Sequence, residues 1–204
     1  GFKEFKTAEL TEKKYEEMGW KYENEIAITG SKAYLKNDGS KPSVGIIGEL
    51  DALHIPVHPE AHTASGNVHA CGHHSQMAAM LGAGYGLDVV KEVLTGEVVM
   101  VAVPAEEYIE IDYRNRLRQE GKLEFFGGKQ EFIRLGAMTD IDISIGSHSA
   151  MDQTELIGVG GSNNGFVGKL VHYIGREAHA GGSPHKGINA LNAAMMGLMG
   201  IHAN

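Results

Sequence analysis

Carboxylates, imidazoles and a thiol lie just after predicted strands or just before a predicted helix in this sequence. The residues concerned are Asp51, Cys71, His73, Glu106, Glu107 and His148. Because ligands bind beyond the carboxyl ends of the strands in open parallel sheets, we expect these side chains to lie close together. Zinc accepts imidazole, thiolate and carboxylate together, whereas manganese favours carboxylate and imidazole. The residue types therefore predict a divalent metal site at this edge of the sheet.

Glu106 and Glu107 form an adjacent pair directly after a predicted strand. A metallohydrolase needs one carboxylate on the metal and a second one that is free. The free carboxylate takes a proton from the attacking water and passes it to the leaving amine. Since neighbouring loop residues can point in different directions, this pair favours a metal-dependent hydrolase.

Each of these features also has an ordinary structural explanation. A Glu-Glu pair is most often a solvated loop, a single histidine is most often a surface or capping residue, and a lone cysteine is most often a small buried hydrophobe. Four more histidines share one predicted loop, and at most two of them are expected to matter: His54, His58, His62 and His69. Only the joint placement at strand ends favours a metal site.

Apolar runs alternate with helical patterns along the first three quarters of the chain. The strongest strand is 97–103, because it is rich in β-branched residues and Pro104 ends it. Thr7 is expected to cap the first helix and Gly19 to end it. We further predict strands at 26–28, 33–35, 44–50 and 141–145, and helices at 7–18, 74–94, 112–119 and 129–135. The alternation predicts an α/β fold with a mostly parallel sheet covered by helices.

The pattern changes after about residue 155. A long alternating strand is predicted at 165–174, and a glycine-bearing apolar helix at 188–201. A strand and a helix at this point indicate the opening of a second domain.

Composition narrows the classes of partner. The 204 residues carry a formal net charge of −8, and neutralising a phosphate backbone takes clustered Lys and Arg, so nucleic acid is not expected. No apolar run approaches the roughly 20 residues that span a bilayer, so a membrane partner is not expected. The single cysteine, Cys71, fits a reducing compartment and predicts a cytoplasmic protein.

Four segments resemble the M20 metallopeptidase-like amidohydrolases, in their aminoacylase or hippurate hydrolase-type branch. These segments are GELDAL (48–53), HACGHH (69–74), VPAEEY (103–108) and GREAHAGGSPHKGINALNAA (175–194). The resemblance implies a catalytic zinc-peptidase-like α/β domain over 1–158 and the beginning of an inserted α+β lid or dimerisation domain over 159–204. It covers nearly the whole chain in the expected order.

The resemblance also implies roles for individual residues. The implied metal ligands are Cys71, His73, Glu107 and His148. Glu106 would be the general acid/base, and Asp51 would orient a ligand imidazole. His179 would reach the substrate carbonyl, often from the partner subunit, and Asn189 could help to hold a substrate carboxylate.

The expected activity is hydrolysis of the amide bond of an N-acyl amino acid or a small peptide-like conjugate. The resemblance implies divalent metal ions, two per complete site, with zinc, manganese, cobalt and nickel all open. It also implies a homodimer formed through the lid domain.

The sequence departs from the family pattern in three respects. His74 and Gln76 replace a usual aspartate and a usual histidine, so contacts at the start of the helix are expected to differ. The last ligand histidine of the family has no counterpart, and the chain is expected to be truncated. A metal-binding or interaction fragment without turnover is therefore the alternative function. A cysteine hydrolase using Cys71 is a third possibility that the glutamate pair disfavours.

Overall fold

The computed structural model describes residues 1–150, 156–160, 162 and 164–203 and divides into two compact units, Gly1–Gln153 and Thr154–Asn204. Each unit is described by itself. The identification of the two units as a catalytic domain and the beginning of a lid domain stays a prediction.

The first unit is built on a mixed sheet with the strand order β1-β2-β6-β3-β7 within the described residues. Its strands are β1 (Lys21–Ile26), β2 (Gly30–Tyr34), β3 (Ser43–Glu49), β6 (Glu97–Val103) and β7 (Ile143–Gly146). Strand β3 runs parallel to β6 and β7, whereas β2 pairs antiparallel with both β6 and β1. The predicted α/β fold is confirmed, and the antiparallel β1–β2 hairpin extends its parallel part.

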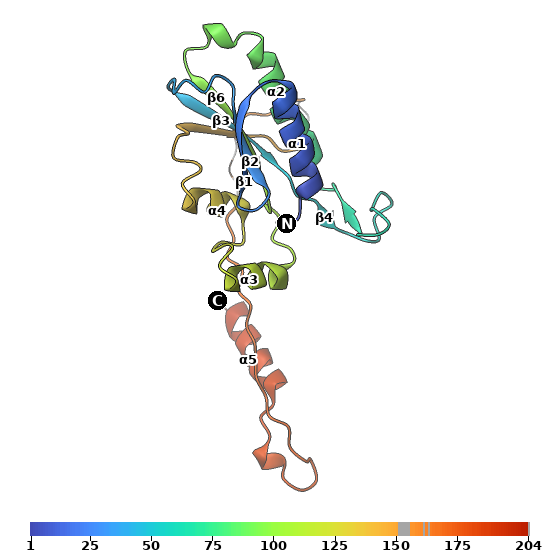
Figure 1. Cartoon of the computed structure of the whole chain (residues 1–204). Coiled ribbons are helices and arrows are strands. Elements are labelled where there is room, and N and C mark those ends of the chain that lie inside the picture. Colours follow the sequence, from blue (N-terminus) through green and yellow to red (C-terminus); the bar gives the residue numbers. More distant parts are fainter. Residues whose placement is uncertain (151–155, 161, 163, 204) are drawn as a thin grey trace. The chain divides into compact units, whose positions relative to one another are not determined.

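Helices cover both faces of this sheet (Figure 1). They are α1 (Phe5–Glu17), α2 (His73–Asp88), α3 (Ile111–Gln119) and α4 (Gly128–Arg134), with a short 3-10 helix, η1 (Lys91–Val93), after α2. The first helix begins two residues before the predicted Thr7, which lies inside α1 and does not cap it, because Glu4 precedes the first turn. Gly19 follows α1 with φ of 69°, as expected of a glycine that ends a helix.

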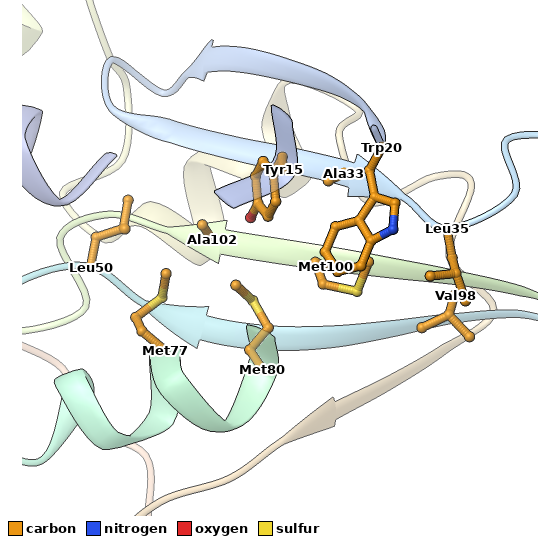
Figure 2. Close-up of a cluster of buried hydrophobic side chains, with 10 residues drawn as sticks. All are labelled: Tyr15, Trp20, Ala33, Leu35, Leu50, Met77, Met80, Val98, Met100 and Ala102. Atoms are coloured by element: carbon orange, nitrogen blue, oxygen red, sulfur yellow. The ribbon is translucent and has the colours of Figure 1, made fainter. Parts of the chain in front are cut away.

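Strand β6 separates two hydrophobic cores, because every residue in it is buried and successive side chains point to opposite faces. On one face Met100 packs with Tyr15 of α1 and Met80 of α2, as Figure 2 shows. On the other face Val101 belongs to the cluster that contains Phe132 of α4. The elements that carry the candidate site are thus held by packing on both sides.

A small hairpin with a long loop lies between β3 and α2 in the sequence. Strand β4 (Leu53–His54) pairs antiparallel with β5 (Asn67–Val68) and closes the loop that carries His58 and His62. In the described residues no helix is both long and apolar enough to cross a membrane.

The second unit contains η2 (Pro184–Lys186) and α5 (Ala190–His202). The strand predicted at 165–174 is wrong, since these described residues form no strand and are exposed. The bridge between Arg176 and Ile188 is isolated. An alternating pattern makes a strand only where a partner strand accepts its backbone hydrogen bonds.

Candidate metal centre

His73 is the central residue of the candidate site and is buried, with 1% of its surface exposed. Its Nδ1 lies 2.9 Å from the backbone oxygen of Asp51 and 3.2 Å from the Oδ1 of the same residue. The opposite ring nitrogen, Nε2, is buried and has no hydrogen-bond partner. Asp51 therefore orients the imidazole and leaves Nε2 directed at the other site residues.

Three carboxylates face His73 Nε2. Glu49 Oε2 lies 3.0 Å away, Glu106 Oε2 3.8 Å and Glu107 Oε1 3.9 Å. Lys129 forms ion pairs with two of them, at close range with Glu49 and at 3.9 Å with Glu106. This cation lies where the negative charges gather.

A thiol and a second imidazole complete the group. Cys71 Sγ lies 3.4 Å from His148 Nε2. One donor atom each from Cys71, His73 and His148 fall within 4.8 Å of one another, and the same holds for Glu49, His73 and Glu106. The structure thus brings together six of the residues that the sequence singled out, Asp51, Cys71, His73, Glu106, Glu107 and His148, while their individual roles stay predictions.

These residues fit a divalent metal ion. Thiol, imidazole and carboxylate groups are the donors that zinc accepts, and the carboxylates and imidazoles also suit manganese. Glu49 Oε2 and His73 Nε2 are buried polar atoms that contact each other at 3.0 Å and have no hydrogen-bond partner beyond that ion pair. A cation between them would satisfy both atoms.

Gly72 allows the start of α2 to approach the segment after β7. Its φ is +97°, and a Cβ at this position would lie 2.1 Å from Ser149 Oγ. The Ser149 hydroxyl donates a hydrogen bond to the backbone oxygen of Cys71 at 3.3 Å. The glycine of the HACGHH segment therefore lets the residue after Cys71 lie close to Ser149, the residue after His148.

The loop that carries the glutamate pair is held by a buried arginine. Arg114 has no exposed surface, and its guanidinium donates hydrogen bonds to the backbone oxygens of Ala105, at 3.3 Å, and of Glu107. The backbone nitrogen of Glu107 donates to Asp51 Oδ2 at 2.9 Å. Ala105 has a φ of 53°, a left-handed conformation that favours glycine. This loop is thus fixed in an unusual conformation beside the site.

The close approach of several carboxylates shifts the pKa values of the site residues. Burial alone would lower the pKa of His73, but the adjacent carboxylates of Asp51 and Glu49 favour the protonated ring and raise that pKa to about 10. Burial opposes ionisation of Glu49, yet His73 and Lys129 lower its pKa to about 2. Burial, together with Glu49, raises the pKa of Glu106.

The thiol of Cys71 is a poor nucleophile in this environment. Burial and the neighbouring Glu107 raise its pKa to about 12, so the thiolate is scarce unless a cation binds. These surroundings disfavour the cysteine hydrolase alternative.

Two residues of the site were missed by the sequence reasoning. Glu49 stands two positions before Asp51, so both residues share one side of the extended chain at the end of β3, and a carboxylate that ends an apolar run was the available signal. Lys129 carries no comparable signal. Gln76, expected to alter contacts near the helix start, accepts a hydrogen bond from the Glu49 backbone at 2.7 Å and donates one to the Ser147 backbone.

The remaining predicted site residues belong to the second unit. His179 Nδ1 accepts a hydrogen bond from the Gly182 backbone at 2.9 Å. Asn189 caps α5, because its side chain accepts from the backbone nitrogen of Asn192. The roles proposed for His179 and Asn189 toward a substrate stay predictions.

Similar proteins of known sequence are hydrolases. An Arabidopsis thaliana protein named IAA-amino acid hydrolase ILR1-like 5 is 36% identical over 110 residues, which cover 52% of this chain and 25% of that protein. The ILR1-like 4 protein of the same plant is 30% identical over 72% of this chain and 30% of its own length. The N-acetyl-L-cysteine deacetylase of Bacillus subtilis is 28% identical over 94% of this chain and 43% of its own length. No protein-family model matches the sequence.

Solved structures share the fold. A putative aminohydrolase from methicillin-resistant Staphylococcus aureus matches with a TM-score of 0.57 and 28% identity, over 72% of this chain and 35% of that one. The Bacillus subtilis YXEP protein, described as a dinuclear metal-binding peptidase from the M20 family, matches with a TM-score of 0.59 and 24% identity, over 74% of this chain and 39% of that one.

The chain is therefore related to amidohydrolases and peptidases, and it shares its fold with a protein described as a metal-binding peptidase of the M20 family, which confirms the resemblance seen in its motifs. The relatives include hydrolases of amino-acid conjugates, carboxypeptidases and a deacetylase. The chain spans 25% to 30% of the length of the first plant relatives it matches.

Proposed function

We propose that this chain supplies the metal-binding part of a hydrolase that cleaves the amide bond of N-acyl amino acids or small peptide-like conjugates. The observation that carries the proposal is the orientation of His73. Its Nδ1 is anchored on Asp51, and its Nε2 faces Glu49 at 3.0 Å and Glu106 and Glu107 at 3.8 and 3.9 Å.

In the proposed site Cys71, His73, Glu107 and His148 hold the metal. A divalent ion held there would supply Lewis acidity, lowering the pKa of a water molecule and polarising a carbonyl oxygen. Glu106 takes a proton from the attacking water and passes it to the leaving amine nitrogen. The raised pKa of Glu106, caused by burial and by Glu49, suits a carboxylate that must hold this proton.

His179 and Asn189 are the residues proposed to contact the substrate. His179 would donate a hydrogen bond to the developing oxyanion, from this subunit or from a partner. Asn189 would contact the substrate carboxylate, a task that competes with its observed hydrogen bond to the start of α5.

The substrate class is supported by the names of the relatives. They describe hydrolysis of an amino-acid conjugate and removal of an acetyl group from an amino acid. The further parts of the proposal are zinc, manganese, cobalt or nickel as the metal, two ions per complete site, a homodimer and a cytoplasmic location. The description of one structural neighbour as dinuclear supports the two ions.

The test is the substitution Glu106→Gln. We expect metal binding, measured by calorimetry, to stay within about threefold, and hydrolysis of a panel of N-acyl amino acids to fall by about 100-fold or more, because the proton acceptor is lost. Glu92→Gln, in η1, is the matched control and should retain both properties. Turnover that survives in Glu106→Gln would contradict the role of Glu106, and metal binding without turnover in the unaltered chain would favour the non-catalytic alternative.

A further inference from the structure

One carboxylate oxygen of Glu49, Oε2, faces His73 at the centre of the site. The surface of Glu49 is 4% exposed, and its Oε2 lies 3.0 Å from His73 Nε2. Both atoms are buried, and neither has a hydrogen-bond partner beyond this ion-pair contact. The two atoms therefore face each other at a distance that either a shared proton or a shared metal ion would explain.

The contacts around Glu49 fix its orientation. Its second oxygen, Oε1, forms an ion pair with Lys129 Nζ, and its backbone nitrogen donates to Gln76 Oε1 at 2.7 Å. One carboxylate oxygen is thus held by Lys129, and the other is left free toward the imidazole. His73 is constrained in the same way, because its Nδ1 is occupied by Asp51.

We propose that Glu49 is a further metal ligand, whose Oε2 binds the same divalent cation as His73 Nε2 and which Lys129 holds in place. This inference rests on the proposed function and adds a residue to its ligand set. Glu49 and His73 belong to a group of donor atoms within 4.8 Å of one another, close enough for the two to bind one ion, while Glu106, the third member of the group, is the proposed proton acceptor beside it. A direct ion pair between Glu49 and a protonated His73 is the competing explanation.

An added carboxylate changes the metal preference of the site. Manganese is a hard ion that favours carboxylate oxygen, whereas zinc also binds well to the thiolate of Cys71 and to imidazole. Glu49 should therefore contribute more to Mn²⁺ binding than to Zn²⁺ binding.

The test is calorimetric titration of the metal-free chain with MnCl₂ and with ZnCl₂. We expect Glu49→Gln, which keeps the shape of the side chain, to weaken Mn²⁺ binding by about tenfold or more and Zn²⁺ binding by less. The matched control is Glu97→Gln, another buried glutamate, 4% exposed, whose carboxylate accepts from the backbone of Lys36 and Asn37. This control should bind both ions as the unaltered chain does.

The outcomes separate the two proposals. Equal Mn²⁺ affinity in Glu49→Gln, within about twofold, would overturn the ligand role of Glu49 and favour the ion pair, leaving the proposed function intact. Absence of metal binding in the unaltered chain would overturn both. If Glu49→Gln fails to fold, Glu49→Asp gives the answer, because its shorter side chain withdraws the oxygen from His73 and should weaken Mn²⁺ binding severalfold, whereas unchanged affinity would contradict the proposal.

Discussion

At the residue scale, His73 divides its two ring nitrogens between different tasks. Nδ1 contacts the backbone and the carboxylate of Asp51, and Nε2 faces three glutamates. A second partner on one nitrogen selects the tautomer and makes the other nitrogen a better ligand. The geometry of one side chain thus links the GELDAL segment to the glutamate pair.

Arg114 positions the glutamate pair without belonging to the set of ligand atoms. Replacing it by methionine keeps the volume but leaves the backbone oxygens of Ala105 and Glu107 without their buried donor. We expect Arg114→Met to lower the free energy of unfolding by about 3 kcal/mol, measured by urea denaturation.

The matched control for this change is Arg116→Met, on the same helix. Arg116 is exposed and lies over the Tyr113 ring, so its replacement should cost less than about 1 kcal/mol. Equal losses in the two variants would show that Arg114 is not what holds the loop.

Sequence reasoning singled out several residues that stand directly after strands, but it missed Glu49 at the end of β3 and Lys129 in α4. Asp51, Glu106 and His148 were found because each follows an apolar run. Lys129 was not found, because its ion pairs with Glu49 and Glu106 join α4 to β3 and to the loop after β6. Side-chain pairs between segments that are distant in the sequence produce no recognisable residue spacing.

At the element scale, the start of α2 sets how closely the thiol approaches the segment after β7. Gly72 has a φ of +97°, and a Cβ there would collide with Ser149. We expect Gly72→Ala to cost about 2–4 kcal/mol in unfolding free energy, from the left-handed backbone and the collision, and to weaken metal binding as well. Urea denaturation and calorimetric titration measure the two effects.

Gly86 is the matched control in the same helix. Nothing lies within 4 Å of a Cβ built at this position, and its backbone is helical. Gly86→Ala should therefore be neutral or stabilise the chain by about 0.5–1 kcal/mol, with unchanged metal binding. A comparable loss in both glycine variants would contradict the argument for Gly72.

Elements with a local signal were predicted well, and those that depend on a partner were not. Strand β6 was predicted with its exact bounds, because a β-branched run ends at Pro104. The run 165–174 has an equally regular pattern but forms no strand. The strand predicted at 33–35 shares only two residues with β2, and its antiparallel pairing to β6 was not predicted, since direction is decided by the long-range contact.

At the scale of the whole molecule, the folded chain gathers more carboxylates than cations at this site. Four carboxylates, those of Glu49, Asp51, Glu106 and Glu107, gather around one imidazole, and Lys129 is the lysine that pairs with them in the described residues. A divalent ion that binds the folded chain would offset this excess of negative charge and shift the folding equilibrium.

We therefore expect metal to stabilise the chain against heat. At about 100 times the dissociation constant, binding adds about 2.7 kcal/mol, which corresponds to a rise in Tm of about 5–10 °C for a chain of this size. Differential scanning calorimetry with ZnCl₂, followed by excess EDTA, should show the rise and its reversal. Cys71→Ala should show a much smaller rise, and an equal rise in that variant would place the stabilising ion elsewhere.

The spread of the site residues along the chain also bears on biosynthesis. The donors run from Glu49 at the end of β3 to His148 beyond β7, and β3 is the strand that pairs with β7. A ribosome must therefore complete both segments before the full set of donors exists, and the intervening loop must close first. A metal centre built from these donors would therefore be complete only late in folding.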